Sequence, residues 1–493
     1  MRDELTPSVC ADPLKQPAVA PVVGLRSNLT AWRLILLVVA AAAPLGAVVG
    51  ILPVAFAFGN GAGLPFTVAL VMVVLALFSV GYSAMSRQVV STGAFYAYVS
   101  RGLGGVAGLG AAAIALVAYP AITCTALAYF GYFTQAAVTS VAGGAPSWIW
   151  FSIGAAIAVG VLGYRGIDLS FRVVAVLVCI EFAVIISLVV AIVGRLGLKA
   201  LPAESFSVHQ LSSGAPGVAV MLVFLLFVGF ESAALYSEEA HNPRRTVARA
   251  TYGVVAVMGV FYLLVAWVTV GAVGGAHIVD VATTSTGSLY SDLAAGYLAP
   301  WVGEVITVAM ATSMFATALA LHNVASRYVF ALGRQRCLPA PLGSAHPRLG
   351  GPHRASLVVS VVTTSVVLIG AIVGADPFVG LGTVAAGLGT VGVMTLQCLA
   401  SLAVVGYLRR HGGGSMWATI VAPVIAFAAM AAATVLAVSR FEMLTGADNP
   451  VINALPALIA VVFVAGAGYG VWLKARRPQQ YGAVTARLSS ESD

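Results

Sequence analysis

The chain has 493 residues, of which 60% are hydrophobic and 9% are charged, and its mean hydropathy is +0.99. Soluble globular proteins carry about 25% charged residues, so this composition excludes a soluble fold. Runs of about 20 apolar residues recur from Leu34 almost to the C-terminus, and each can cross a hydrocarbon core of about 30 Å. Because lipid offers no hydrogen-bond partners to the backbone, such runs must be helical. We therefore expect an all-α polytopic membrane protein.

Twelve membrane-spanning helices are predicted between two polar tails. We expect them at about 34–58, 66–86, 105–136, 147–164, 172–194, 216–236, 251–274, 301–333, 356–374, 378–408, 415–438 and 451–473. Residues 1–33 form the N-terminal tail, residues 34–474 the membrane domain, and residues 475–493 the C-terminal tail.

The basic residues predict the orientation of the chain in the membrane. If the N-terminus is cytoplasmic, all 25 lysines and arginines except Arg195, Lys199 and Arg440 fall on the cytoplasmic side. This is the bias of the positive-inside rule, and the opposite orientation would invert it. We expect a multi-pass protein of the plasma membrane with both termini in the cytoplasm. The net charge of +8 then reflects these loops and does not indicate a nucleic-acid partner.

The motifs of soluble enzymes and of ATP-driven pumps are absent. The sequence contains no GxxxxGK[ST], HExxH or GxSxG motif and no dinucleotide fingerprint placed after a strand. The five cysteines form no C-x-x-C pair and the seven histidines show no ligand spacing. We expect no enzyme activity, no metal site and no bound cofactor. What remains is intramembrane polarity and broken helices, which mark transport pathways.

The first span contains residues that interrupt a helix. Pro44 and Pro53 each remove a backbone donor, and Gly46 and Gly50 permit unusual dihedral angles. An interruption near the middle of the membrane would leave N–H and C=O groups free to hold a small zwitterion. A kinked helix with glycines for close packing is the alternative interpretation.

The sixth span contains a glycine and a carboxyl group in the segment 227–233. Glu231 costs about 2.5–3.5 kcal/mol or more to bury in a membrane, so it must be paired, protonated or in contact with water. Alternatively, Glu231 is a structural group that caps unwound backbone N–H groups. Glu238 and Glu239, with Arg244 and Arg245, are interpreted as a charge cluster at the inner surface.

Three groups of residues resemble one transporter family. They are Gly229-Phe230-Glu231 with Glu238-Glu239 and Asn242-Pro243-x-Arg245; Gly81-Tyr82-x-x-Met85-Ser86-Arg87 with Gly93-Ala94-Phe95-Tyr96; and Asn323-x-x-Ser326-Arg327. They are similar to the signatures of the sixth helix, the second helix and the eighth helix of amino acid permeases of the amino acid–polyamine–organocation (APC) superfamily. Their order and their side of the membrane also match, and they span most of the chain.

The resemblance implies a LeuT-like fold, in which two five-helix repeats are inverted relative to each other. Here the repeats would cover about 34–194 and 216–408, and two extra C-terminal helices would cover 415–473. In such proteins the first and sixth helices unwind halfway, and a small solute binds between them. Its carboxylate meets N–H groups of the first interruption, and its ammonium group meets carbonyls of the sixth helix.

Carried over to this chain, the resemblance places the interruptions at about Ala43–Gly46 and Phe227–Ser232. The predicted substrate-binding residues are Ala43, Pro44, Leu45, Gly46, Tyr119, Phe227, Gly229, Phe230, Glu231 and Ser232. Many family members have Gly-Ser-Gly or Gly-Thr-Gly where this chain has Pro44-Leu45-Gly46. Tyr119 and Tyr129 of the third span can line a cavity, although aromatic residues at this spacing also serve packing alone.

Glu181, about ten residues inside the fifth span, is the predicted proton-coupling residue. Some proton-coupled relatives carry a lysine in this helix, whose charge replaces a sodium ion. A low dielectric favours the neutral form of a carboxyl group, so Glu181 could load a proton outside and release it inside. A hydrogen-bonded structural role is the alternative. Sodium coupling also stays open, with Thr312, Ser313 and Thr317 as candidate ligands.

The leading hypothesis is a secondary active transporter that moves an amino acid or a related amine by alternating access, with proton coupling. The alternatives are an exchanger of amino acids or amines and a non-transporting sensor on the same fold. The expected partners are this small solute and the lipid bilayer, and the oligomeric state is left open.

Overall fold

The computed structural model describes residues 29–42, 44–89, 93–165, 167–412, 415–442, 449–479 and 481–482. In this part of the chain twelve helical segments are long and apolar enough to cross a membrane, which confirms the predicted number. The same ranges contain no β-strand, and their β-structure is limited to an isolated bridge between Leu29 and Ala240.

Two of the twelve spans are built from several short elements. The first consists of α1 (Ala31–Ala41), α2 (Pro44–Gly46), a π-helix (Ala47–Ile51) and α3 (Leu52–Phe58). The sixth consists of α10 (Pro216–Leu226) and a 3-10 helix (Phe230–Glu239).

The other ten spans are dominated by long helices. These are α4 (Leu64–Ser86), α6 (Gly105–Ala142), α7 (Trp148–Arg165), α8 (Ile167–Leu196), α11 (Pro243–Val273), α14 (Pro300–Arg334), α15 (His353–Ile372), α16 (Thr383–His411), α17 (Ala422–Ser439) and α20 (Pro456–Arg476). Shorter helices connect them: α5 (Ala94–Leu103), α9 (Val208–Leu211), α12 (Ile278–Thr284), α13 (Leu289–Tyr297) and α19 (Pro450–Asn453).

The helix bounds differ most from prediction in the seventh span. We expected this span to begin at residue 251, but α11 begins at Pro243 and includes Arg244, Arg245 and Arg249. Proline is favoured in the first turn of a helix because its missing N–H has no intrahelical partner there. The long arginine side chains reach water from the helix end, so their charge does not end the helix.

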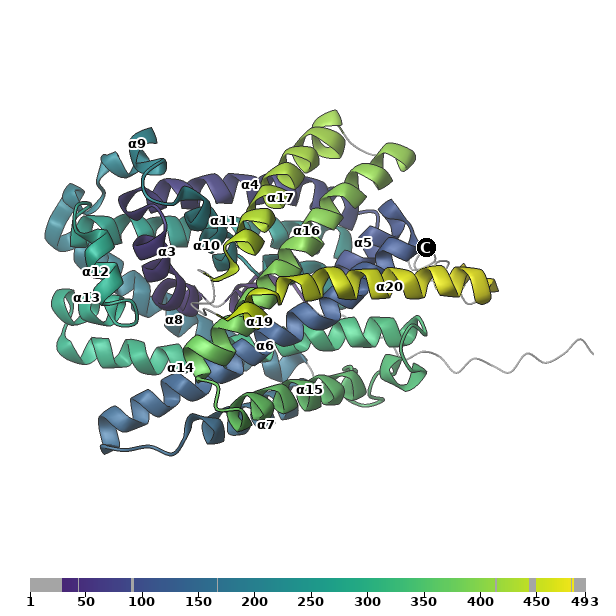
Figure 1. The fold of residues 1–493 in the computed structure, drawn as a ribbon, viewed down its shortest axis with the longest axis horizontal. Coiled ribbons are helices and arrows are strands. Elements are labelled where there is room, and N and C mark those ends of the chain that lie inside the picture. The colour runs from purple at the N-terminus through teal and green to yellow at the C-terminus, as the bar shows by residue number, and fades with distance from the viewer. Residues whose placement is uncertain are drawn as a thin grey trace, which may run out of the picture.

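The long helices lie mainly along the longest axis of the molecule (Figure 1). The short helices α12 and α13 lie at one end, and α20 ends at the other. In the 18-residue apolar stretch of the sixth span 89% of the residues are buried, against 22% in that of the last span, so the sixth lies at the centre of the bundle and the last at its periphery.

The glycine-rich face of the tenth span serves close packing. A Cβ on Gly389 would lie 2.2 Å from a side-chain carbon of Ile122 on α6, and a Cβ on Gly392 would lie 2.7 Å from that of Ala118. Small residues at such positions let two membrane helices approach closely. This contact brings α16 against α6 beside the interrupted spans.

Candidate functional site

The first interruption begins where α1 ends, at Ala41. Pro44 lacks a backbone N–H and disfavours helical geometry in the residue before it, which explains why the regular helix stops here. Ala43 lies outside the described residues. The Thr317 hydroxyl of α14 shares its proton between the carbonyl of Ser313 in its own helix (2.9 Å) and the carbonyl of Ala40 (3.2 Å), one of the groups that a helix end leaves unpaired.

The second interruption begins where α10 ends, at Leu226. Gly229 has φ +106°, in the left-handed region that favours glycine. A Cβ at this position would lie 3.0 Å from the carbonyl carbon of Ala41. Position 229 therefore requires glycine for two reasons, its backbone angle and the close approach of the Ala41 backbone. The two interruptions contact each other at Gly229 and Ala41.

Glu231 joins four spans on the sixth-span side of this contact, three through its carboxyl group and the second span through its backbone carbonyl. Its Oε1 accepts a hydrogen bond of 2.9 Å from the hydroxyl of Tyr119. Its Oε2 accepts hydrogen bonds from the backbone N–H of Gly229 (3.1 Å) and from the amide of Gln397 (3.3 Å). The Tyr82 hydroxyl donates to the Glu231 carbonyl at 3.0 Å. Glu231 is 1% exposed, so these bonds offset the cost of its burial.

Glu181 lies at the first interruption. Its Oε2 accepts a hydrogen bond of 3.1 Å from the backbone N–H of Leu45 in α2. Ser313 of α14 is next to the same carboxyl group, and its buried hydroxyl has no other hydrogen-bond partner in the described ranges. Glu181 is itself 1% exposed. The fifth span thus holds the interrupted segment of the first span through an ionisable group.

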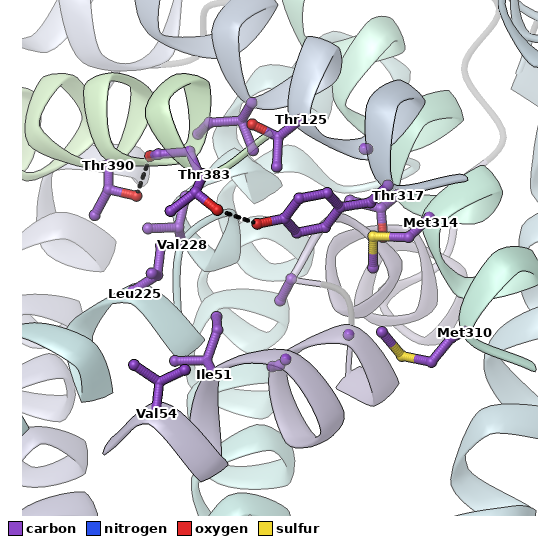
Figure 2. A pocket seen from close by; sticks show the side chains of 18 of the residues that line it. Ile51, Val54, Thr125, Leu225, Val228, Met310, Met314, Thr317, Thr383 and Thr390 are labelled. Atoms are coloured by element: carbon purple, nitrogen blue, oxygen red, sulfur yellow. Dashed lines mark hydrogen bonds between the residues drawn. The ribbon is translucent and has the colours of Figure 1, made fainter. Parts of the chain in front are cut away.

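A cavity of about 170 Å³ lies between the interrupted spans and their neighbours. Figure 2 shows labelled side chains of five spans around it. The lining residues come from the first, third, sixth, eighth and tenth spans: Ala41, Ala42, Gly46, Ala47, Gly50, Ile51, Val54, Ile122, Thr125, Ala126, Tyr129, Leu222, Leu225, Val228, Met310, Met314, Thr317, Phe378, Thr383, Ala386 and Thr390.

The lining is mainly apolar, and none of its side chains is charged. Its hydroxyl groups are largely engaged with protein groups. Tyr129 and Thr383 are hydrogen-bonded at 3.0 Å (Figure 2). Thr125 donates to the carbonyl of Gly382 at 3.0 Å. The ring of Phe378 stacks on that of Tyr129 with centroids 4.8 Å apart, so the third and tenth spans meet over the cavity.

The helix ends add partial charges that the side chains lack. The second part of the first span begins at Pro44–Gly46, and its N-terminal end carries positive partial charge. The C-terminal end of α10 at Leu226 carries negative partial charge. Gly46 on one side and Leu225 on the other both line the cavity, so it lies between ends of opposite sign.

The structure places the predicted binding residues in two groups. Gly46 lines the cavity, as does Tyr129. Pro44 and Leu45 lie next to Gly46 in α2, and the Leu45 N–H is bonded to Glu181.

The second group lies around the Glu231 carboxyl group and does not line the cavity. Tyr119 and Gly229 donate to this carboxyl group, and the buried Ser232 hydroxyl has no partner in the described part of the chain. Phe227 packs edge-on against Tyr262 and Phe230 against Phe78, with centroids 5.4 and 5.7 Å apart.

Several residues of the site were missed by the sequence analysis. Gln397 carried a usable signal, since an amide within an apolar span demands a partner. Met310, Met314 and Phe378 carried none, because apolar residues that face a cavity look the same in sequence as those that face lipid or the core.

This arrangement, a small cavity between two interrupted spans in a twelve-span bundle, is typical of a membrane transporter. Residues 29–465 match the model of the amino acid permease family, so the chain belongs to this family within the APC superfamily. It is a multi-pass membrane protein and a permease, not an enzyme.

Individual relatives are more distant. The chain is 26% identical to an uncharacterised transporter of Mycobacterium tuberculosis, over 66% of this chain and 70% of the relative. It is 30% identical to a branched-chain amino acid permease of Lactococcus lactis, over 38% of this chain and 40% of the relative. It is also 26% identical to a methylthioribose transporter of Bacillus subtilis, over 50% of this chain and 49% of the relative.

Proposed function

We propose that this permease imports an amino acid or a related amine with an uncharged, mainly apolar side chain, and that a proton moves with it through Glu181. The observation that carries the proposal is the bond between Glu181 and the N–H of Leu45, because it joins an ionisable group to the interruption beside the cavity. Relatives named as amino acid permeases support the substrate class.

The cavity supports the side-chain preference. A pocket of about 150 Å³ lined by aliphatic and aromatic residues can hold a benzene-sized group, and this cavity measures about 170 Å³. Met310, Met314, Leu225 and Val228 offer apolar contact. A charged side chain would lose its hydration here and find no lining residue of opposite charge, at a cost that a small solute cannot recover.

The helix ends support recognition of the zwitterionic part. A carboxylate is stabilised near the N-terminal end at Pro44–Gly46, and an ammonium group near the carbonyl end of α10. These backbone groups are independent of the side-chain lining. One pair of helix ends therefore serves many amino acids, and the apolar wall selects among them.

The interruptions support two inverted five-helix repeats. The first span, which opens the first repeat, and the sixth span, which opens the second, are each interrupted, and they touch at Ala41 and Gly229. Alternating access follows when one set of helices rocks around this contact. The last two spans would then lie outside the repeats.

Proton coupling follows from what the carboxyl group can bind in each state. A charged Glu181 accepts the Leu45 N–H strongly and holds α2 in place. Protonation weakens this bond and removes a charge from the membrane interior, which makes movement of the first span less costly. Of the candidate sodium ligands, Thr317 is hydrogen-bonded to the Ala40 carbonyl. Ser313 lies next to Glu181, where a sodium ion could replace the proton. Sodium coupling is thus the second candidate for the driving ion.

For the orientation we propose cytoplasmic termini in the plasma membrane, on the basis of the basic residues. An exchanger and a non-transporting sensor are the alternative functions of the same site. An exchanger takes up solute only against solute trapped inside, and a sensor binds solute without flux.

The test uses purified full-length protein in proteoliposomes and a panel of radiolabelled amino acids and amines. Accumulation of leucine, valine or methionine under an inward proton gradient, with little uptake of lysine or glutamate, is the expected result. Uptake only with unlabelled solute trapped inside would replace the symporter by an exchanger. Binding of a solute without flux would indicate a sensor. Accumulation driven by a sodium gradient alone would replace proton coupling by sodium coupling.

A further inference from the structure

Four arginines surround a second cavity, at the end of the bundle where α4 ends and α11 begins. The cavity measures about 450 Å³ and is lined by Arg87, Arg244, Arg245, Ala248, Arg249 and Tyr252. Arg87 directly follows α4, and the other five residues lie in the first three turns of α11. None of the four arginines forms an ion pair with a side chain that the structure describes; the side chains of Glu238 and Glu239, which the sequence analysis grouped with Arg244 and Arg245, lie outside that description.

This arrangement is unfavourable without an anion. Like charges at positions i and i+4 of a helix repel each other, as Arg245 and Arg249 do. Positive side chains in the first turn also oppose the positive partial charge of the helix N-terminus. Arg244 and Arg245 occupy that turn of α11. An anion in the cavity would attract all of these positive groups and would thereby offset both repulsions.

Guanidinium groups bind phosphate with particular strength. Each presents a planar set of N–H donors that matches two phosphate oxygens at once. Four such groups around one cavity, together with the helix N-terminus, form a site for a phosphate ester.

The surface above the cavity identifies the source of that phosphate. Continuing along α11 from Arg245 and Arg249, the exposed residues up to Val260 are Tyr252, Ala256, Val257 and Val260. Tyr252, Ala256 and Val260 follow Arg249 at intervals of three or four residues, which places them along one side of the helix. A basic cavity that continues into an apolar stripe matches a phospholipid. The lipid phosphate would fill the cavity, and an acyl chain would lie along the stripe.

We propose that the arginine cavity binds the headgroup of an anionic phospholipid in the leaflet at this end of the bundle. The proposal is independent of the transported solute and goes beyond the transport function. Each basic residue near an anionic surface contributes about 1 kcal/mol, or roughly a fivefold change in binding. Loss of two arginines is therefore expected to weaken lipid binding by roughly 25-fold.

The test compares purified wild-type protein with the double variant Arg245→Gln/Arg249→Gln. Detergent-solubilised protein is titrated with phosphatidylglycerol or phosphatidylcholine, and bound lipid is counted by native mass spectrometry. The matched control is Arg409→Gln/Arg410→Gln, which removes two exposed arginines from the end of α16, outside the cavity. Should the double variant not fold, each single variant is expected to lose binding by roughly fivefold.

Support would be retention of phosphatidylglycerol by the wild type and the control, its loss in the Arg245/Arg249 variant, and little retention of phosphatidylcholine by any of them. Equal phosphatidylglycerol binding by the wild type and the Arg245/Arg249 variant would overturn the proposal. A parallel arm adds inorganic phosphate at millimolar concentration. Displacement of the lipid by phosphate would assign the cavity to a soluble anion and would also overturn the lipid source.

Discussion

The carboxyl group of Glu181 accepts a 3.1 Å hydrogen bond from the backbone N–H of Leu45, 136 residues earlier in the chain. An ionisable side chain of the fifth span is thereby bonded to the backbone at the interruption of the first. Movement of α2 must break or rearrange this bond. The protonation state of one residue can therefore control the geometry of the segment next to the cavity.

Glu181→Gln is expected to abolish uptake driven by a proton gradient and to leave counterflow exchange largely intact. Glutamine has nearly the same shape and can still accept the Leu45 N–H, but it cannot exchange a proton at neutral pH. The measurement is uptake into proteoliposomes with and without an inward proton gradient, followed by exchange against trapped solute. Gradient-driven uptake at the wild-type level would make Glu181 a structural residue.

Glu231→Gln is expected to reduce both transport and stability. The carboxyl group accepts bonds on both oxygens, whereas an amide has one acceptor oxygen and would turn its NH2 group towards a donor from Tyr119, Gly229 or Gln397. Leaving one buried polar group unpaired costs about 1–3 kcal/mol. Thermal unfolding and initial uptake rates measure the effect. Tyr119→Phe, which removes one donor, should cost less; normal uptake and stability in Glu231→Gln would contradict the assigned role.

Gly229→Ala is expected to destabilise the protein by about 1–3 kcal/mol, the range for strained backbone. A side chain at φ +106° is strained, and its Cβ would lie 3.0 Å from the backbone of Ala41. Gly154→Ala is the matched control, because a Cβ at Gly154 of α7 meets no atom within 4 Å. Helix propensity predicts a gain of up to about 1 kcal/mol there. Equal thermal stability of both variants would show that the contact between the interruptions does not require glycine.

Met314→Phe is expected to weaken transport of large apolar amino acids more than transport of alanine. The larger ring takes up part of the cavity of about 170 Å³ that Met314 lines. Met416→Phe is the control, since Met416 is 71% exposed and lies outside the cavity. Competition against a labelled substrate gives the relative affinities, and an expected shift of about tenfold corresponds to about 1.4 kcal/mol. An unchanged ratio of the affinities for leucine and alanine would show that the cavity does not select the substrate.

The spans, the first interruption and the buried carboxyl groups could be predicted from the sequence, because each depends on the chemistry of the residues themselves. Apolar runs of sufficient length predicted the twelve spans, because lipid forces the backbone into helices whatever the neighbours are. Pro44 indicated the first interruption for a similar reason, since proline alters the backbone through its own geometry. The second interruption was expected from the family resemblance, and Gly229 with its positive φ lies in it. Glu181 and Glu231 could be singled out because a carboxyl group within a membrane is costly wherever it lies.

The tertiary structure decided the partners of these residues. Nothing in the sequence around Glu181 indicates Leu45, and nothing around Glu231 indicates Gln397, which lies 166 residues further on. The same holds for the cavity wall. Met314 and Val228 face the cavity while Val257 and Val260 are exposed on the outside, yet all four are ordinary apolar residues of a span. Hydropathy measures transfer into an apolar environment, and lipid, core and cavity wall are all apolar, so only packing distinguishes them.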